Sequence, residues 1–88
     1  APLHIATFFG NLEIVRALLE NGSDVNAVIS NTLDTSLHLA CEKDFKDIVK
    51  ELLIHSSKVS IKNKDGLTPL DLVDPQDKDY YEGLLLIF

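Results

Sequence analysis

The feature that most constrains the fold of this chain is a repeat, because one pattern recurs after 34 and then 33 residues, at Leu3, Leu37 and Leu70. The stretches "PLHIA" (2–6), "SLHLA" (36–40) and "PLDLV" (69–73) align, and "EIVRALL" (13–19) aligns with "DIVKELL" (47–53). A unit of this length buries its apolar side only against a neighbouring unit. The repeat therefore predicts a stack of similar layers.

Each unit has the pattern of two helices joined by a turn. Thr35 and Thr68 are placed to cap a first helix, and Pro69, like Pro2, suits the first helical position. In the first unit, this helix is expected to stop near Gly10. A second, amphipathic helix follows, with apolar residues at Ile14, Val15, Leu18 and Leu19. The next stretch is rich in turn-forming residues and is expected to return as a protruding hairpin-like loop.

Two turns of the second unit lack the glycines of the first. Asp44 stands where the first unit has Gly10, and Ser56 stands where it has Gly22. Both positions favour a residue that tolerates positive φ. We therefore expect these two turns to be strained.

These motifs resemble the ankyrin-repeat family, whose unit of about 33 residues carries T-P-L-H-x-A and two helices. The resemblance covers nearly the whole chain, including "PLHIATFFGNLEIVRALLENGSDVNA" and "TSLHLACEKDFKDIVKELLIHSSKVSIKNKDGLTPL". It implies an all-α solenoid of stacked helix-turn-helix units with hairpin-like loops, whose concave face consists of loops and first helices. We expect one domain over residues 1–88, with repeats at 1–34, 35–67 and 68–88. The first repeat lacks its threonine cap and the last is atypical and truncated, so a piece of a longer array is expected.

The charge balance and the single cysteine exclude several classes of partner. Fourteen acidic against eight basic residues give a formal charge of −6, which repels a phosphate backbone, so no nucleic-acid partner is expected. The longest apolar run, "LLLIF", is too short to cross a bilayer, so no membrane insertion is expected. Cys41 is alone and forms no internal disulfide, which favours a cytoplasmic or nuclear location.

Any enzyme hypothesis would depend on His4 and His38, which occupy equivalent positions. In the family that the chain resembles, this histidine is structural. We expect His38 to join layers through both ring nitrogens, and His4 to lack one partner because its threonine is absent. Cys41 is expected to be buried and inert. Asp71 offers one carboxylate at the third equivalent position, so no metal site, cofactor or catalytic residue is expected.

The resemblance places partner contacts on the hairpin tips and on the exposed ends of the first helices. Two adjacent phenylalanines either fill a gap between repeats or contact a partner. An apolar first tip favours a docking site, and two lysines on the second tip fit an acidic segment of a partner. The predicted contact residues are Phe8, Phe9, Glu42 and Lys43 on helices, and Val28, Ile29, Leu33, Lys62, Lys64 and Leu67 on hairpins.

Asn26 has two interpretations. "LLENGSDVN", with Leu18 eight residues before Asn26, resembles the pattern at which ankyrin-repeat asparagines are hydroxylated by a dioxygenase. The structural alternative is that the asparagine stabilises the base of the hairpin through side-chain hydrogen bonds.

The last unit departs most from the repeat. Asp74 and Pro75 are expected to cut its first helix short. We expect its second helix to turn an apolar face containing Tyr80 and Leu84 outward, opposite an inward set of Tyr81, Leu85 and Leu86. Such a face is unfavourable in water, so further chain, a partner or a second copy is expected to cover Tyr80 and Leu84.

Together these observations favour a non-enzymatic module that binds a partner protein through its hairpin tips and concave face. The alternative is a structural or regulatory segment of a larger chain whose catalytic or channel domain lies elsewhere. The partner itself is not encoded in the repeat, because a shared frame does not determine what its variable positions recognise.

Overall fold

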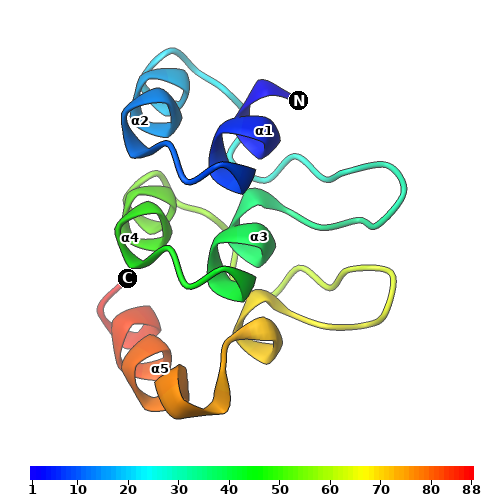
Figure 1. Cartoon of the computed structure of the whole chain (residues 1–88), viewed down its shortest axis with the longest axis vertical. Coiled ribbons are helices and arrows are strands. Elements are labelled where there is room, and N and C mark those ends of the chain that lie inside the picture. Colours follow the sequence, from blue (N-terminus) through cyan, green and yellow to red (C-terminus); the bar gives the residue numbers. More distant parts are fainter.

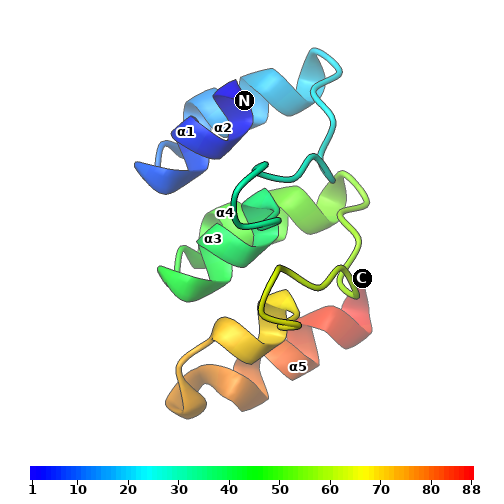
Figure 2. The same ribbon diagram turned by 90° about the vertical axis from the view of Figure 1, so that its right-hand side faces the viewer.

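The structure is a computed structural model that describes all residues 1–88, and it is helical, with no strands. Its three layers stack along the long axis of the molecule (Figures 1 and 2). The first layer contains α1 (Pro2–Phe8) and α2 (Leu12–Glu20). The second layer contains α3 (Ser36–Glu42) and α4 (Lys46–Ile54). The third layer contains two 3-10 turns, η1 (Pro69–Leu72) and η2 (Pro75–Asp77), followed by α5 (Lys78–Ile87). The expected all-α solenoid is confirmed. None of these helices has the length and apolar character needed to cross a membrane.

Two hairpin loops project from the same side of the stack and lie one above the other (Figures 1 and 2). We call residues 23–34 the first hairpin and residues 57–67 the second hairpin. Backbone hydrogen bonds close each one, from Ile29 N to Asp34 O at 2.9 Å in the first and from Asn63 N to Leu67 O at 2.9 Å in the second.

The first helices begin where the sequence places their caps. Thr35 caps α3 with a capping box in which its hydroxyl accepts from the His38 N–H, and the His38 ring accepts from the Thr35 N–H. Thr68 and Asp71 form the same box at η1. Ala1, at the corresponding position before α1, provides no side-chain cap, so the proline at the first helical position is the remaining start signal there.

The turns of the second layer adopt the expected positive φ at non-glycine residues. Asp44 has φ 58° and Ser56 has φ 67°, against 72° and 90° at Gly10 and Gly22. A third such residue, Leu33 at φ 60°, was not expected. Leu33 precedes Thr35 by the same two residues by which Gly66 (φ 77°) precedes the next threonine. A side chain in this region costs of order 1–2 kcal/mol, so the hairpin tip carries strain.

The core runs through the stack as a column of equivalent residues from successive layers. Val15 and Val49 are fully buried, as are Ile48 and Leu52 on the side of α4 that packs against the first layer. The residue of the first layer equivalent to Ile48 is Ile14, which is 49% exposed because no layer covers it. The end of the stack at α1 and α2 therefore has an open apolar groove of about 470 Å³.

The third layer is irregular for the expected reason. The first helix is replaced by η1, which ends at Leu72 and is followed by the extended residue Val73. Asp74 then caps η2 by accepting from the Gln76 N–H, with Pro75 at the first position of η2. The chain thus changes direction before α5 begins. The expectation that Asp74 and Pro75 cut the first helix short is confirmed.

The expected outward position of Leu84 is wrong. Leu84 is only 7% exposed and belongs to the core, whereas Leu86, assigned to the inward set, is 88% exposed. The helix is held with Tyr81, 1% exposed, pointing into the stack, and the residues three and four positions later share its face. Leu86 falls outside that face, so the exposed apolar residues of this helix are Tyr80, Leu86, Ile87 and the final Phe88.

Tyr81 fixes the orientation of α5 through a hydrogen bond to the strained turn of the second layer. Its hydroxyl donates to Asp44 Oδ1 at 2.6 Å, and Lys46 Nζ donates to the same carboxylate at 2.7 and 2.8 Å. The hydrogen bonds from Lys46 and Tyr81 lower the pKa of Asp44 below its ordinary value. Burial, followed by the hydrogen bond to Asp44, raises the pKa of Tyr81 above its ordinary value.

The stability of the protein is expected to fall as the pH rises above about 10, the ordinary pKa of tyrosine. Above this pH, Tyr81 stays protonated in the folded state but ionises in the unfolded chain. Because the folded state then binds one more proton than the unfolded state, the free energy of unfolding falls as the pH rises. Urea unfolding at increasing pH measures the decline, and Tyr81→Phe should make it shallower. Tyr80→Phe is the matched control, because Tyr80 is exposed and its replacement does not remove the hydrogen bond from Tyr81 to Asp44. Equal slopes for wild type and Tyr81→Phe would contradict the assignment.

Candidate functional site

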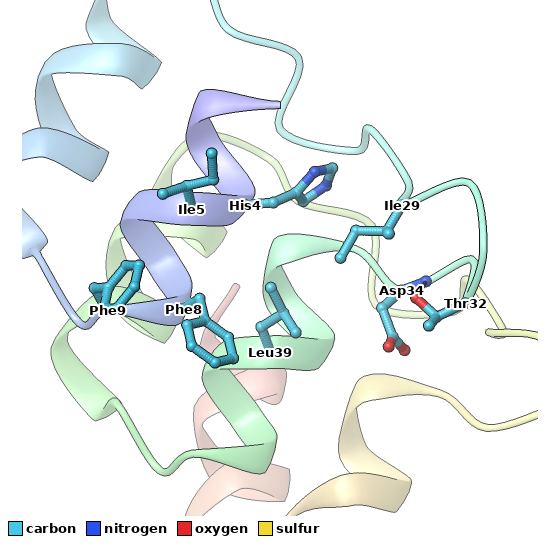
Figure 3. Close-up of a pocket in the computed structure, with 8 residues that line it drawn as sticks. All are labelled: His4, Ile5, Phe8, Phe9, Ile29, Thr32, Asp34 and Leu39. Carbon is cyan, nitrogen blue, oxygen red and sulfur yellow. Dashed lines mark hydrogen bonds between the residues drawn. The ribbon is translucent and has the colours of Figure 1, made fainter.

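An open, shallow apolar groove lies on the hairpin side of the molecule, between α1, α3 and the first hairpin. It has a volume of about 440 Å³ and is open to solvent. Figure 3 shows its eight lining residues, which are His4, Ile5, Phe8, Phe9, Ile29, Thr32, Asp34 and Leu39. Three of the predicted contact residues, Phe8, Phe9 and Ile29, are thus brought together by the fold. We call this surface the hairpin groove.

Phe8 and Phe9 form one wall of the hairpin groove, at the C-terminal end of α1. Their rings pack edge to face with centroids 5.2 Å apart. Lys43 Nζ, from the end of α3, lies 4.2 Å from the centre of the Phe8 ring, a favourable cation–π distance. Phe8 is 49% and Phe9 is 75% exposed, so neither ring is buried between layers.

His38 joins the second layer to the second hairpin. Its Nδ1 accepts from the Thr35 N–H at 3.0 Å and lies 2.9 Å from Thr35 Oγ1, so the ring proton is on Nε2, which donates to Leu67 O at 2.9 Å. The ring is fully buried, and the expected structural role at this position is confirmed.

His4 is held by one ring nitrogen only. Its Nε2 lies 2.8 Å from Ala27 O, in the first half of the first hairpin, and its buried Nδ1 has no partner. The missing partner is the one expected from the absence of threonine at position 1. His4 contacts Ala27 in the first half of the first hairpin, whereas His38 contacts Leu67, the last residue of the second hairpin. The two imidazoles therefore hold their hairpins at different points.

The first hairpin supplies the opposite wall of the groove. Ile29 is half-buried there, while Val28 is 43% and Leu33 is 42% exposed. Leu33 lies between the lining residues Thr32 and Asp34 in the chain and does not itself line the groove. The apolar character expected at this tip is thus divided between the groove and the open surface.

The other predicted contact residues lie near the groove or on the second hairpin. Glu42 and Lys43 are exposed at the end of α3. Lys62 and Lys64 are exposed on the second hairpin, and the backbone of the exposed Leu67 accepts the His38 hydrogen bond. Of these residues, the structure brings only Lys43 into contact with the groove, through Phe8.

Asn26 stabilises the junction between the two hairpins. Its side-chain Oδ1 accepts from the Lys58 N–H at 2.8 Å, and its own N–H donates to Asp24 Oδ1 at 2.9 Å. The structural interpretation of this asparagine is therefore confirmed. Its hydroxylation stays a prediction.

Cys41 is a core residue of α3. It is 5% exposed, and burial, together with the nearby Asp44 carboxylate, raises its pKa to about 12. A thiol with this pKa stays protonated near neutral pH and is a poor nucleophile. The expected inert character of Cys41 agrees with this environment. No cluster of three or more His, Cys, Asp or Glu side chains has a geometry suited to a metal ion.

Five of the eight groove residues were not predicted as contacts, and one of them, His4, had been assigned only a structural role. Ile5 and Leu39 occupy the variable position of the two L-H-x-A motifs, and both are apolar although the position faces the hairpins. The presence of an apolar residue at both of these variable positions was the sequence signal that could have identified Ile5 and Leu39. Thr32 and Asp34 gave no signal, because only the path of the hairpin backbone directs them toward the groove.

Comparison with known proteins identifies relatives over most of the chain. A family model described as ankyrin repeats (3 copies) matches residues 3–73. Protein phosphatase 1 regulatory subunit 27 of Mus musculus is 39% identical over 82 residues, which is 93% of this chain and 53% of that protein. The putative ankyrin repeat protein FPV031 of fowlpox virus is 41% identical over 69 residues, which is 78% of this chain and 20% of that protein. The chain thus spans about half the length of the phosphatase subunit.

A solved structure confirms the arrangement of the helices. The ankyrin repeat domain of Bcl-3, described as a unique member of the IkappaB protein family, superimposes with a TM-score of 0.86 at 28% sequence identity. The match covers 94% of this chain and 36% of that one.

Proposed function

Because the chain belongs to the ankyrin-repeat family, we propose that it is a non-enzymatic module that binds a partner protein through its hairpin tips and the concave face of its first helices. Ankyrin repeats are generally protein–protein interaction modules, and their fold is typically non-catalytic. The observation that carries the proposal is the hairpin groove, in which Phe8, Phe9 and Ile29 form an open apolar surface. Exposed apolar surfaces of this kind commonly mark interaction sites.

The proposed contact surface extends from the groove to both hairpin tips and the end of α3. On the first hairpin it includes Val28 and Leu33, whose exposed side chains add apolar area beside the groove. On the rest of the surface it includes Glu42, Lys43, Lys62, Lys64 and Leu67. Buried aromatic anchors dominate the energy of most interfaces, so Phe8 and Phe9 are the proposed centre. We place the protein in the cytoplasm or nucleus, where ankyrin-repeat proteins are common and a free thiol such as that of Cys41 persists.

We expect Phe8→Ser to reduce capture of partner proteins from a cell lysate by about tenfold or more, as for an interface anchor. The melting temperature should change by only a few degrees, because the ring is half exposed. Quantitative mass spectrometry of proteins cross-linked to the immobilised chain measures capture, and circular dichroism measures melting.

Ile54→Ser is the matched control for this experiment. Ile54 is 60% exposed on α4 and does not line the hairpin groove, so this variant should capture the same proteins as the wild type. If Phe8→Ser and wild type captured the same proteins in the same amounts, the groove would not be the binding site.

A regulatory role within a larger protein is the second candidate function. The observation that favours it is the similarity to a protein named as a regulatory subunit of protein phosphatase 1. The first candidate function requires the hairpin groove, whereas a regulatory role can use another surface. A change in protein phosphatase 1 activity on adding the chain, equal for wild type and Phe8→Ser, would favour regulation through another surface.

A further inference from the structure

The two hairpin tips are joined directly, so the second hairpin has a fixed place beside the hairpin groove. Lys64 N donates to Thr32 O at 2.9 Å, and Asn63 Nδ2 donates to Asp34 Oδ1 at 3.0 Å. Thr32 and Asp34 both line the groove (Figure 3). A ligand that fills the groove and continues toward the second tip therefore meets the residues around Lys64.

The second hairpin is the basic part of an acidic protein. It contains Lys58, Lys62 and Lys64 against the single Asp65, whereas the rest of the chain has five basic and thirteen acidic residues. Neither Lys62 nor Lys64 takes part in any of the ion pairs of the structure. Both side chains are exposed.

Three carboxylates lie near these lysines, and two of them already accept hydrogen bonds. Asp34 accepts from the Asn63 amide, and Asp71 accepts from the backbone and hydroxyl of Thr68. The Thr68 hydrogen bonds, followed by the positive charges of Lys78 and Lys62, lower the pKa of Asp71. Asp65 follows Lys64 in the tip. The hairpin itself carries three lysines against the one carboxylate of Asp65, and none of the three nearby carboxylates forms an ion pair with Lys62 or Lys64.

The strain at Leu33 is a second, independent observation at this surface. Leu33 adopts φ 60° where the equivalent residue of the second hairpin is Gly66, and its side chain is 42% exposed. A bulky side chain in this conformation lowers the stability of the fold, and the side chain of Leu33 buries little apolar area that would offset this cost. Strained residues of this kind cluster at ligand-binding segments. The position of Leu33 between Thr32 and Asp34 puts the strained residue at the edge of the groove.

We infer that the hairpin groove and the second hairpin together bind an extended peptide segment of a partner protein in which a large apolar side chain lies close to two or more acidic residues. The apolar side chain fills the groove between Phe8 and Ile29, and the peptide backbone beside it crosses the exposed side chain of Leu33 at the edge of the groove. The acidic residues lie on Lys62 and Lys64. This inference rests on the proposed function and specifies the chemistry of the partner.

Selection from a library of random twelve-residue peptides displayed on phage, with the wild-type chain immobilised, tests the inference without a known partner. We expect the enriched peptides to combine a large apolar residue with an excess of Asp and Glu. Synthetic copies of the most enriched peptide should bind more weakly as the salt concentration rises, because the lysines are exposed and screened. Enrichment of basic or uncharged peptides would overturn the inference.

Two pairs of variants identify the residues responsible, with fluorescence anisotropy of the labelled peptide as the readout. Lys62→Glu combined with Lys64→Glu should weaken binding by about tenfold or more, whereas Lys50→Glu, an exposed lysine on α4, should leave it unchanged. Leu33→Gly should weaken binding while raising the melting temperature, since it removes both the contact and the strain. Ser56→Gly relieves strain at an exposed turn away from the tips and should raise the melting temperature without changing binding.

The outcomes separate this inference from the proposed function. If the enriched peptides lack acidic residues but lose binding to Phe8→Ser, the groove binds proteins and the inferred chemistry is wrong. If no peptide is enriched and no protein is captured from lysate, both are wrong. Self-association of the chain that competes with the peptide would show that a second copy occupies the groove, which would also overturn the inference.

Discussion

Replacing His38 by glutamine is expected to lower the free energy of unfolding by about 3 kcal/mol, the upper end of the cost of leaving buried polar groups unsatisfied. The imidazole is fully buried and connects the Thr35 N–H to the Leu67 carbonyl. Glutamine differs from imidazole in shape, and its amide does not reproduce the two opposed contacts of the ring. Urea unfolding monitored by circular dichroism measures the change.

His4→Gln provides the matched control within the same molecule. His4 makes one hydrogen bond, to Ala27 O, and its Nδ1 is already without a partner. Its replacement should therefore cost only about 1 kcal/mol, the typical net value of one hydrogen bond. Equal losses for the two variants would show that the paired contacts of His38 do not stabilise the junction between α3 and the second hairpin. Loss of an enzymatic activity in His38→Gln with the stability unchanged would contradict the structural role altogether.

The second large effect is expected at Ile48, where truncation to alanine should cost about 3 to 4 kcal/mol, as for a large aliphatic side chain in a closed core. Ile48 is fully buried on the face of α4 that packs against α2. Ile14→Ala removes the same atoms from the equivalent residue of α2, which is 49% exposed, and should cost less than about 1 kcal/mol. The same unfolding experiment measures both variants.

The comparison of Ile48 and Ile14 also tests whether the open end of the stack is covered in solution. If a second copy covers the groove at α1 and α2, the loss at Ile14 should approach the loss at Ile48 and should grow with protein concentration. Similar losses at all concentrations would contradict the arrangement in which α2 has one open face.

The fold was predictable from the sequence because its strongest signal is a period, and a period fixes both the elements and their stacking. Thr35 identifies the start of α3, and the positive φ at Asp44 and Ser56 follows from the glycines one period earlier. The unsatisfied nitrogen of His4 was predictable for the same reason, since one repeat has the threonine and the other does not. Each of these predictions compares two copies of one unit.

The position of Leu84 was not predicted because the third unit breaks the spacing. From the start of the first helix to the start of the second there are nine residues in this unit (69–77) and ten in the unit before it (36–45), so counting from the first helix displaces the helical face by one residue. The "KD" pairs at 46–47 and 78–79 would have corrected the alignment, since they match Leu84 with the fully buried Leu52 and Leu86 with the exposed Ile54. The exposed apolar residues of this end were consequently expected to include Leu84, whereas in the structure they are Tyr80, Leu86, Ile87 and Phe88. The open apolar groove at α1 and α2 was not predicted.

The candidate site was predicted only in part, because its residues come from elements that the period does not place relative to one another. Phe8 and Phe9 were identifiable as apolar residues at positions that should be exposed. The contribution of Thr32 depends on the path of the hairpin, and the φ of Leu33 has no counterpart in the apolar pattern. The hydrogen bond from Lys64 to Thr32, which connects the tips, is a backbone contact that no side-chain pattern indicates.

The layered packing has a consequence for how the molecule opens. The main helix contacts between layers join neighbours, with α1 on α3, α2 on α4 and α3 on η1, so each layer depends on the one beside it. The layer containing α5 is joined to the rest by its 3-10 turn, by the core residues Tyr81 and Leu84, and by one hydrogen bond to Asp44. Fraying should start at this layer and proceed toward α3, in steps rather than as a single event. Loss of the C-terminal layer alone leaves α1, α3 and the first hairpin in place, so the hairpin groove can outlast the integrity of that layer.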